Sequence, residues 1–150
     1  MVTTRLASPS DAPVIHDLIQ LYVPSGELLP RSVEFVSLRA HEFVVAESHG
    51  RVVGCAHLDE YAPSLAELRS LAVAPEAQGR GVGVALVAAI EQLAARRGFA
   101  TLFAVSNSAA FFAKRGYEER DVPELNRERS EVSRWKTVHA KQIGAGIATS

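Results

Sequence analysis

The chain has 150 residues, the size of one domain that can bury a hydrophobic core. Apolar residues make up 47 % of it and charged residues 22 %, a balance that excludes an intrinsically disordered protein. The net charge of −1 excludes an overall basic field for nucleic acid or an anionic membrane, and the one cysteine, Cys55, excludes an internal disulfide and a multi-cysteine metal site.

Apolar periodicity and turn residues divide the chain into alternating elements. β-branched runs predict strands, and apolar residues three or four apart predict helices. In chain order we expect a strand, two helices, a hairpin of two strands, a fourth strand, a long helix, a strand and a short helix. A turn into another strand and a last strand follow. The corresponding residues are 2–7, 8–22, 31–41, 42–48, 51–61, 66–74, 82–97, 101–106, 108–116, 117–122 and 135–143. This order indicates an α/β domain whose helices flank a mixed sheet.

The two ends of the chain carry few structural signals. The N-terminal stretch has no apolar core of signal-peptide length, and no segment reaches transmembrane length, so we expect a cytoplasmic protein without membrane contact. The domain is expected to span residues 1–143. The small polar tail, residues 144–150, is expected to be disordered.

Three glycines stand directly before the long helix, in the string "QGRGVG" of residues 78–83. Glycine lets the backbone approach a phosphate closely, and the free amides of a helix N-terminus bind anions. A Walker loop would end in Gly-Lys-Ser/Thr, and a dinucleotide fingerprint would read Gly-x-Gly-x-x-Gly after the first strand. The string fits neither pattern, so it predicts a phosphate-binding turn of another kind.

A third pattern does match. The stretch "LAVAPEAQGRGVGVALV" resembles the acetyl-CoA-binding motif of the GNAT N-acetyltransferase superfamily, Gln/Arg-x-x-Gly-x-Gly/Ala. The opening "ASPSDAPVIHDLI", the hairpin with Gly54 and the late "FFAKRGY" extend the resemblance over almost the whole chain. It implies a single domain with a mixed, mostly antiparallel, twisted sheet whose central strands splay apart.

The resemblance also implies acetyl-CoA as the acyl donor and direct attack of an amine on the thioester. The turn amides would hold the pyrophosphate, the strand before them would pair with the pantetheine arm, and the amide of Leu71 or Val73 would polarise the thioester carbonyl. Cofactor contacts are thereby expected at Leu71, Ala72, Val73, Gln78, Gly79, Arg80, Gly81, Val82, Gly83 and Phe112.

Shorter strings resemble the acetyltransferase domain of N-acetylglutamate synthases, which acetylate glutamate in the first step of arginine biosynthesis. These strings are "ELLPRS", "VVGCAHL", "AELRSLAV" and "LFAVS…FFAKRGY", and the chain resembles the short, stand-alone form. The match implies Glu67 as the base, directly or through water, and Ser106 as the acid that protonates the thiolate. Solvation of Glu67 and capping of the following helix by Ser106 are the alternatives.

A glutamate-like acceptor needs cations for its carboxylates, and arginine binds a carboxylate with two hydrogen bonds. The residues expected to bind the acceptor are Arg31, Arg69, Arg134 and Lys136. The family's Arg-x-Ser-Lys string is altered here to "SRWK", so a different small amine, another amino acid or a protein N-terminus stands as the alternative acceptor. A non-catalytic acetyl-CoA sensor or partner subunit is the alternative of another class.

The remaining charged and metal-binding signals are weak. The basic residues near the C-terminus alternate with acidic residues, which indicates a solvated face, so no nucleic-acid partner is expected. The five histidines show no i, i+4 pair or acidic partner in sequence, so no metal is expected. A small-molecule amine is the expected partner, and the sequence permits a homodimer.

Overall fold

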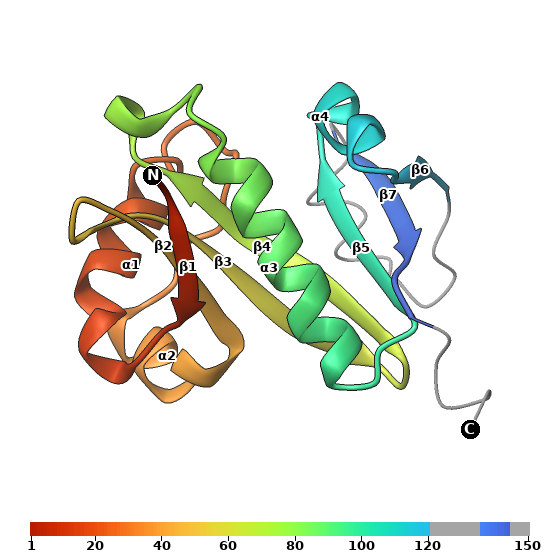
Figure 1. Ribbon diagram of the computed structural model, residues 1–150, viewed down its shortest axis with the longest axis horizontal. Helices are drawn as coiled ribbons and strands as arrows, with labels where there is room; N and C mark the ends of the chain where they lie inside the picture. The colour runs from red at the N-terminus through yellow and green to blue at the C-terminus, as the bar shows by residue number, and fades with distance from the viewer. Residues whose placement is uncertain (121–135, 145–150) are drawn as a thin grey trace. The chain divides into compact units, whose positions relative to one another are not determined.

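The computed structural model describes residues 1–120 and 136–144 (Figure 1). Within them, strands form one seven-stranded sheet in the order β1-β2-β3-β4-β5-β7-β6. The β4–β5 pair is parallel, whereas the β1–β2, β2–β3, β5–β7 and β6–β7 pairs are antiparallel. The predicted α/β fold with a mixed, mostly antiparallel sheet is confirmed.

The chain divides into two compact units, described separately below. Unit 1 comprises Met1–Asp59 and Leu68–Leu93. Its elements, some of which continue into unit 2, are β1 (Thr3–Leu6), η1 (Pro9–Asp11), α1 (Ala12–Gln20), α2 (Val33–Leu38), η2 (Ala40–Glu42), β2 (Phe43–Ser48), β3 (Arg51–Ala62), β4 (Leu65–Val73), η3 (Pro75–Ala77) and α3 (Val82–Arg96). The predicted hairpin turns at His49 and Gly50, both at positive φ.

Helix α3 packs on the strand face of unit 1 that carries Gly54. A β-carbon added to Gly54 would lie 2.9 Å from Cδ1 of Leu86 and 3.0 Å from Cγ1 of Val82. The helix can approach β3 this closely because residue 54 has no side chain. The apolar face predicted for this helix is buried: Leu86, Val87, Ile90, Leu93 and Ala94.

Helix α2 packs on the opposite strand face. Side chains alternate along a strand, so His57 points away from the face that carries Gly54. The ring of Phe35 in α2 stands edge-on to His57, with centroids 5.9 Å apart, and Phe43 stacks on His57 at 4.3 Å. The helices of unit 1 therefore cover both faces of its strands, as the α/β reading predicts.

Asp11 fixes the entry to α1. Its carboxylate accepts hydrogen bonds from both terminal nitrogens of Arg5, at 2.8 and 3.0 Å, and from the amide of Ser8 at 2.7 Å. Arg5 lowers the pKa of Asp11 from 3.8 to about 2. The first turn is the 3-10 element η1 rather than α-helix, a shift of three residues from the predicted helix start.

We expect Asp11 to make the stability of the protein depend on pH. The folded-state pKa lies below the unfolded value, so Asp11 stabilises the fold above about pH 4, and this stability is lost as the pH falls towards about 2. Asp11→Asn should lower the free energy of unfolding at pH 7 by about 1–2 kcal/mol. Urea denaturation between pH 2 and 7 measures this, with the exposed Asp17→Asn as control. If the free energy of unfolding changed equally with pH in the wild type and in Asp11→Asn, Asp11 would not be the source of the pH dependence.

Unit 2 comprises Glu60–Glu67 and residues from Ala94 onward. Besides the ends of β3, β4 and α3, it holds β5 (Thr101–Ser106), α4 (Ala109–Lys114), β6 (Glu118–Glu119) and β7 (Thr137–Gln142). Leu65, Phe103 and Ala140 form a buried cluster, against which Tyr61, Ala62, Val105 and Val138 pack. The parallel register of β4 with β5 covers Leu65–Glu67 and Thr101–Phe103, although both strands are longer, which fits the predicted splay.

Most predicted elements occur where expected, with small differences at their ends. The turn expected at residues 117–122 contains a strand of two residues, and the last strand begins at Thr137 rather than at residue 135. The polar segment before the last strand, for which a loop or an exposed helix is expected, and the tail expected to be disordered lie largely outside the described residues. Within the described chain, every helix is too short or too polar to cross a bilayer.

Candidate active site

The glycine turn follows η3 and leads directly into α3. Gly79 and Gly81 have φ values of 79° and 80°, in the left-handed region that favours glycine, and open space surrounds both positions. Gly83 differs from these two, because it lies within the first turn of α3. The turn residues 79–81 are exposed, so the backbone at the start of a 15-residue helix is accessible to an anion.

Tyr22 connects this turn to the strand before it. Nε2 of Gln78 donates a hydrogen bond to the Tyr22 hydroxyl at 2.7 Å, and that hydroxyl donates to the carbonyl of Val73. Gln78 and Val73 are both expected cofactor contacts, so Tyr22 holds two parts of the predicted donor site together. No local pattern indicates this link, because 56 residues separate Tyr22 from Gln78.

The backbone of β4 has an irregular residue at Ser70, directly before Leu71. Ser70 has a φ of 54° and is buried, a conformation that a non-glycine residue seldom adopts within a strand. Its carbonyl accepts a hydrogen bond from the Cys55 thiol at 3.5 Å. The irregularity changes the direction of the backbone beside the Leu71 and Val73 amides expected to meet the thioester.

Cys55 is fully buried, and burial raises the pKa of its thiol to about 12. A thiol is nucleophilic as the thiolate, so Cys55 stays protonated and inert near neutral pH. Cys55 is thus part of the hydrophobic core. An acyl-cysteine intermediate at this residue is therefore excluded.

Arg31 and Arg69, two expected acceptor contacts, both lie in unit 1. The guanidinium of Arg31 lies over the Phe35 ring, 5.0 Å from its centroid, and the Arg31 carbonyl bonds to Nδ1 of His16 at 2.8 Å. Nη1 of Arg69 donates to the Asp59 carboxylate at 3.3 Å. Arg69 is thus engaged with an acid from the neighbouring strand.

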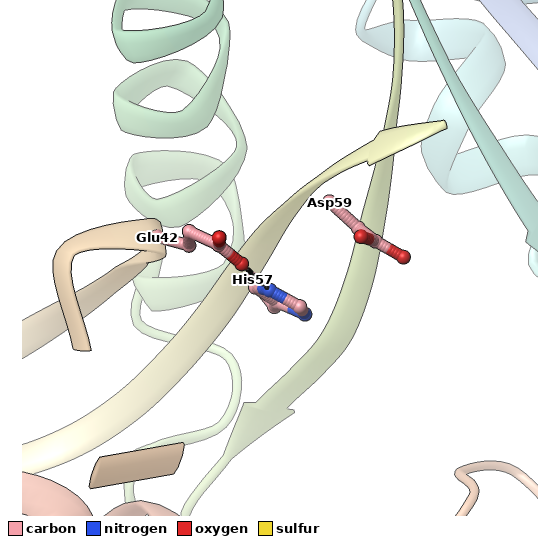
Figure 2. A group of neighbouring side chains, drawn as sticks. All are labelled: Glu42, His57 and Asp59. Atoms are coloured by element: carbon pink, nitrogen blue, oxygen red, sulfur yellow. Dashed lines mark hydrogen bonds and ion pairs between the residues drawn. The ribbon is translucent and has the colours of Figure 1, made fainter. Parts of the chain in front are cut away.

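A polar cluster in unit 1 consists of Glu42, His57 and Asp59 (Figure 2). Nε2 of His57 donates to Oε1 of Glu42 at 2.8 Å, and donor atoms of all three residues lie within 4.8 Å of one another. Burial lowers the pKa of His57, while Glu42 and Asp59 act in the opposite direction. The sequence spacing did not indicate this acidic partner of His57, because Glu42 lies 15 residues away. Each carboxylate already has a protein partner, Glu42 in His57 and Asp59 in Arg69.

Glu67, the expected base, lies in unit 2 and is 3 % exposed, so the alternative of a solvated strand-end carboxylate is wrong. Ser106, the expected acid, ends β5. Its hydroxyl accepts a hydrogen bond from the Ser108 amide at 2.9 Å, and Ser108 is the N-cap residue of α4. Ser106 therefore binds the amide of the N-cap residue but is not itself the N-cap of α4, so the capping alternative holds only in part.

Two further residues expected in the site, Phe112 and Lys136, belong to unit 2. Phe112 is buried between His139, whose ring is parallel to it at 5.7 Å, and Tyr117, whose ring is edge-on at 5.3 Å. Tyr117 is 4 % exposed, as expected for a core residue. Lys136 is partly exposed directly before β7. Arg134 lies outside the described residues.

Comparison with known proteins gives one consistent result. The model of the acetyltransferase (GNAT) family matches residues 13–117. The amino-acid acetyltransferase of Neisseria meningitidis is 38 % identical over 131 residues, which cover 84 % of this chain but 30 % of that protein. The solved N-acetylglutamate synthase from Neisseria gonorrhoeae, complexed with coenzyme A and N-acetyl-glutamate, has a TM-score of 0.84 and 34 % identity, covering 95 % of this chain and 35 % of that one.

A shorter relative matches over its whole length. The structure of Rv2747 from Mycobacterium tuberculosis, in complex with CoA and NLQ, has a TM-score of 0.82 and 26 % identity, covering 93 % of this chain and 98 % of that chain. The Neisseria relatives are about three times as long as the matched region.

Proposed function

Because the chain belongs to the acetyltransferase (GNAT) family and is an N-acetyltransferase that uses acetyl-CoA, we propose that it acetylates the amino group of a small molecule, with L-glutamate as the first candidate. The observation that carries this proposal is the similarity over more than nine-tenths of the chain to the gonococcal enzyme with N-acetyl-glutamate in its structure. The proposal places the protein in arginine biosynthesis.

The donor side rests on the glycine turn. The positive φ values and the open space at Gly79 and Gly81 leave room for a pyrophosphate against the backbone, and the α3 N-terminus supplies a favourable field. Val82 and Gly83 add amides of the first helical turn. Gln78 is held at the edge of this turn by Tyr22.

The reaction we propose is direct acyl transfer. The acceptor ammonium loses a proton to Glu67, and the resulting amine attacks the thioester carbon, whose oxygen is polarised by a β4 amide. The carbon–sulfur bond then breaks, and the thiolate takes the hydroxyl proton of Ser106. Ser106 recovers a proton from the attacking nitrogen, which loses its second proton as the amide forms. The inert state of Cys55 supports this direct route, since no protein thiolate competes for the acyl group.

The acceptor side rests on Arg31. Its guanidinium is stacked on Phe35, and its carbonyl is anchored to His16 of α1, so the loop before α2 is fixed from two directions. A guanidinium held over an aromatic ring is a suitable group for binding an amino-acid carboxylate. Arg69 is a weaker candidate, because Asp59 already engages it.

A panel of the twenty amino acids, assayed for release of coenzyme A thiol from acetyl-CoA, tests the proposal. We expect turnover with L-glutamate at a kcat/KM at least about tenfold above that for other amino acids, since a site built for a polar group rejects analogues that lack it. N-acetylglutamate in the product, detected by mass spectrometry, confirms the acceptor. Acetylation of peptide N-termini without turnover of any amino acid would contradict the proposal.

A further inference from the structure

A second arginine shares the aromatic ring on which Arg31 lies. The guanidinium carbon of Arg39, the residue that ends α2, lies 4.1 Å from the centroid of Phe35. Arg39 is half-buried, and within residues 1–120 and 136–144 its side chain forms no hydrogen bond or ion pair. A cation held against a ring without an acidic partner can still bind an anion.

The spacing of these residues explains how they meet. Arg31, Phe35 and Arg39 are four residues apart, so they line one side of α2 and its ends. Phe35 contacts His57 of β3 with its edge, so this side of α2 faces the strands rather than the solvent. Both guanidiniums lie within 5.0 Å of one ring centroid, which places them within about 10 Å of each other.

The backbone that carries both arginines is held in place. The hydroxyl of Ser32 caps α2 by accepting a hydrogen bond from the Phe35 amide at 3.0 Å, and the Arg31 carbonyl is bonded to His16. Nη1 of Arg31 donates to the carbonyl of Pro30 at 3.2 Å. The two cations are therefore presented by an ordered segment, which reduces the entropy lost when a ligand binds.

Two like charges this close repel each other, and a ligand with two negative groups relieves that repulsion. We propose that Arg31 and Arg39 bind the two carboxylates of the acceptor, one carboxylate each, so that Arg39 determines the preference for a dicarboxylic amino acid. This inference rests on the proposed function. Arg39 thereby takes the role expected for Arg134 and Lys136.

The test compares Arg39→Gln with the wild type on three acceptors: L-glutamate, L-glutamine, which lacks the side-chain charge, and L-isoglutamine, which lacks the α-carboxylate charge. We expect Arg39→Gln to raise the KM for glutamate about 10- to 100-fold, because a charged hydrogen bond is lost. One of the two amides lacks the carboxylate that Arg39 binds. For that amide, Arg39→Gln should change the KM less than about threefold, because the contact with Arg39 is already missing. The KM for acetyl-CoA should stay unchanged.

Two further variants sharpen the result. Arg51→Gln, at an exposed position of β3, removes the same charge away from Phe35 and should leave all three KM values unchanged. Arg39→Lys keeps the charge but loses the planar fork, and should recover less than half of the lost affinity on a logarithmic scale. Equal effects of Arg39→Gln on all three acceptors, or no effect on any of them, would overturn the inference while leaving glutamate as the substrate. A wild-type protein inactive on every dicarboxylic amino acid would overturn the proposed acceptor and the inference with it.

Discussion

Replacing Glu67 by glutamine is expected to lower kcat by about two to four orders of magnitude, the range over which a positioned base contributes to catalysis. Glutamine keeps the size of the side chain and removes its basicity, so the KM for acetyl-CoA should change little. The effect is measured as thiol release under saturating acetyl-CoA, across a range of pH. The acidic limb of the pH–rate profile should disappear along with the activity.

The matched control is Glu60→Gln, which removes the same charge at an exposed position of β3. Because Glu67 is buried, thermal denaturation of each variant must show that the fold is kept. Glu67→Asp retains a carboxylate on a shorter side chain and should keep more activity than Glu67→Gln. Turnover within about threefold of the wild type in Glu67→Gln, with an unchanged pH profile, would assign the proton transfer to another group.

Gly81→Ala should weaken acetyl-CoA binding about 10- to 100-fold. At a φ of 80° a β-carbon introduces strain of about 1–3 kcal/mol, and relaxation of that strain turns the amides away from the phosphate position. Isothermal titration with coenzyme A measures the effect on binding alone. Gly50→Ala, at a φ of 74° in the β2–β3 turn, introduces similar strain away from the donor site and should leave the Kd for coenzyme A unchanged. Similar losses of affinity in both variants would show that the glycine turn has no special role.

Local patterns were sufficient for the elements of the fold. The three- and four-residue spacing of apolar side chains located α3, and the His49–Gly50 dipeptide located the hairpin turn. These signals lie within a few residues of one another, so one sequence contains them in full. The glycine turn was equally visible, because a helix N-terminus and its glycines are contiguous in the chain.

Contacts between distant segments were less predictable, on the donor side as well as on the acceptor side. His57 is paired with Glu42, and the hydroxyl of Tyr22 links Gln78 with Val73. No periodicity predicts such contacts, because they depend on how the strands and helices pack. The positive φ of Ser70 was also not predictable, because the sheet imposes it and a serine carries no local signal for it.

The burial of Cys55 has a consequence for an enzyme that makes a free thiol at every turnover. A reactive cysteine beside that product would form a mixed disulfide with coenzyme A under oxidising conditions, and the protein would be progressively modified. The one thiol of this chain is covered on every side and stays protonated. The protein is therefore protected from its own product, and thiol-reactive dyes added to the folded enzyme report coenzyme A alone.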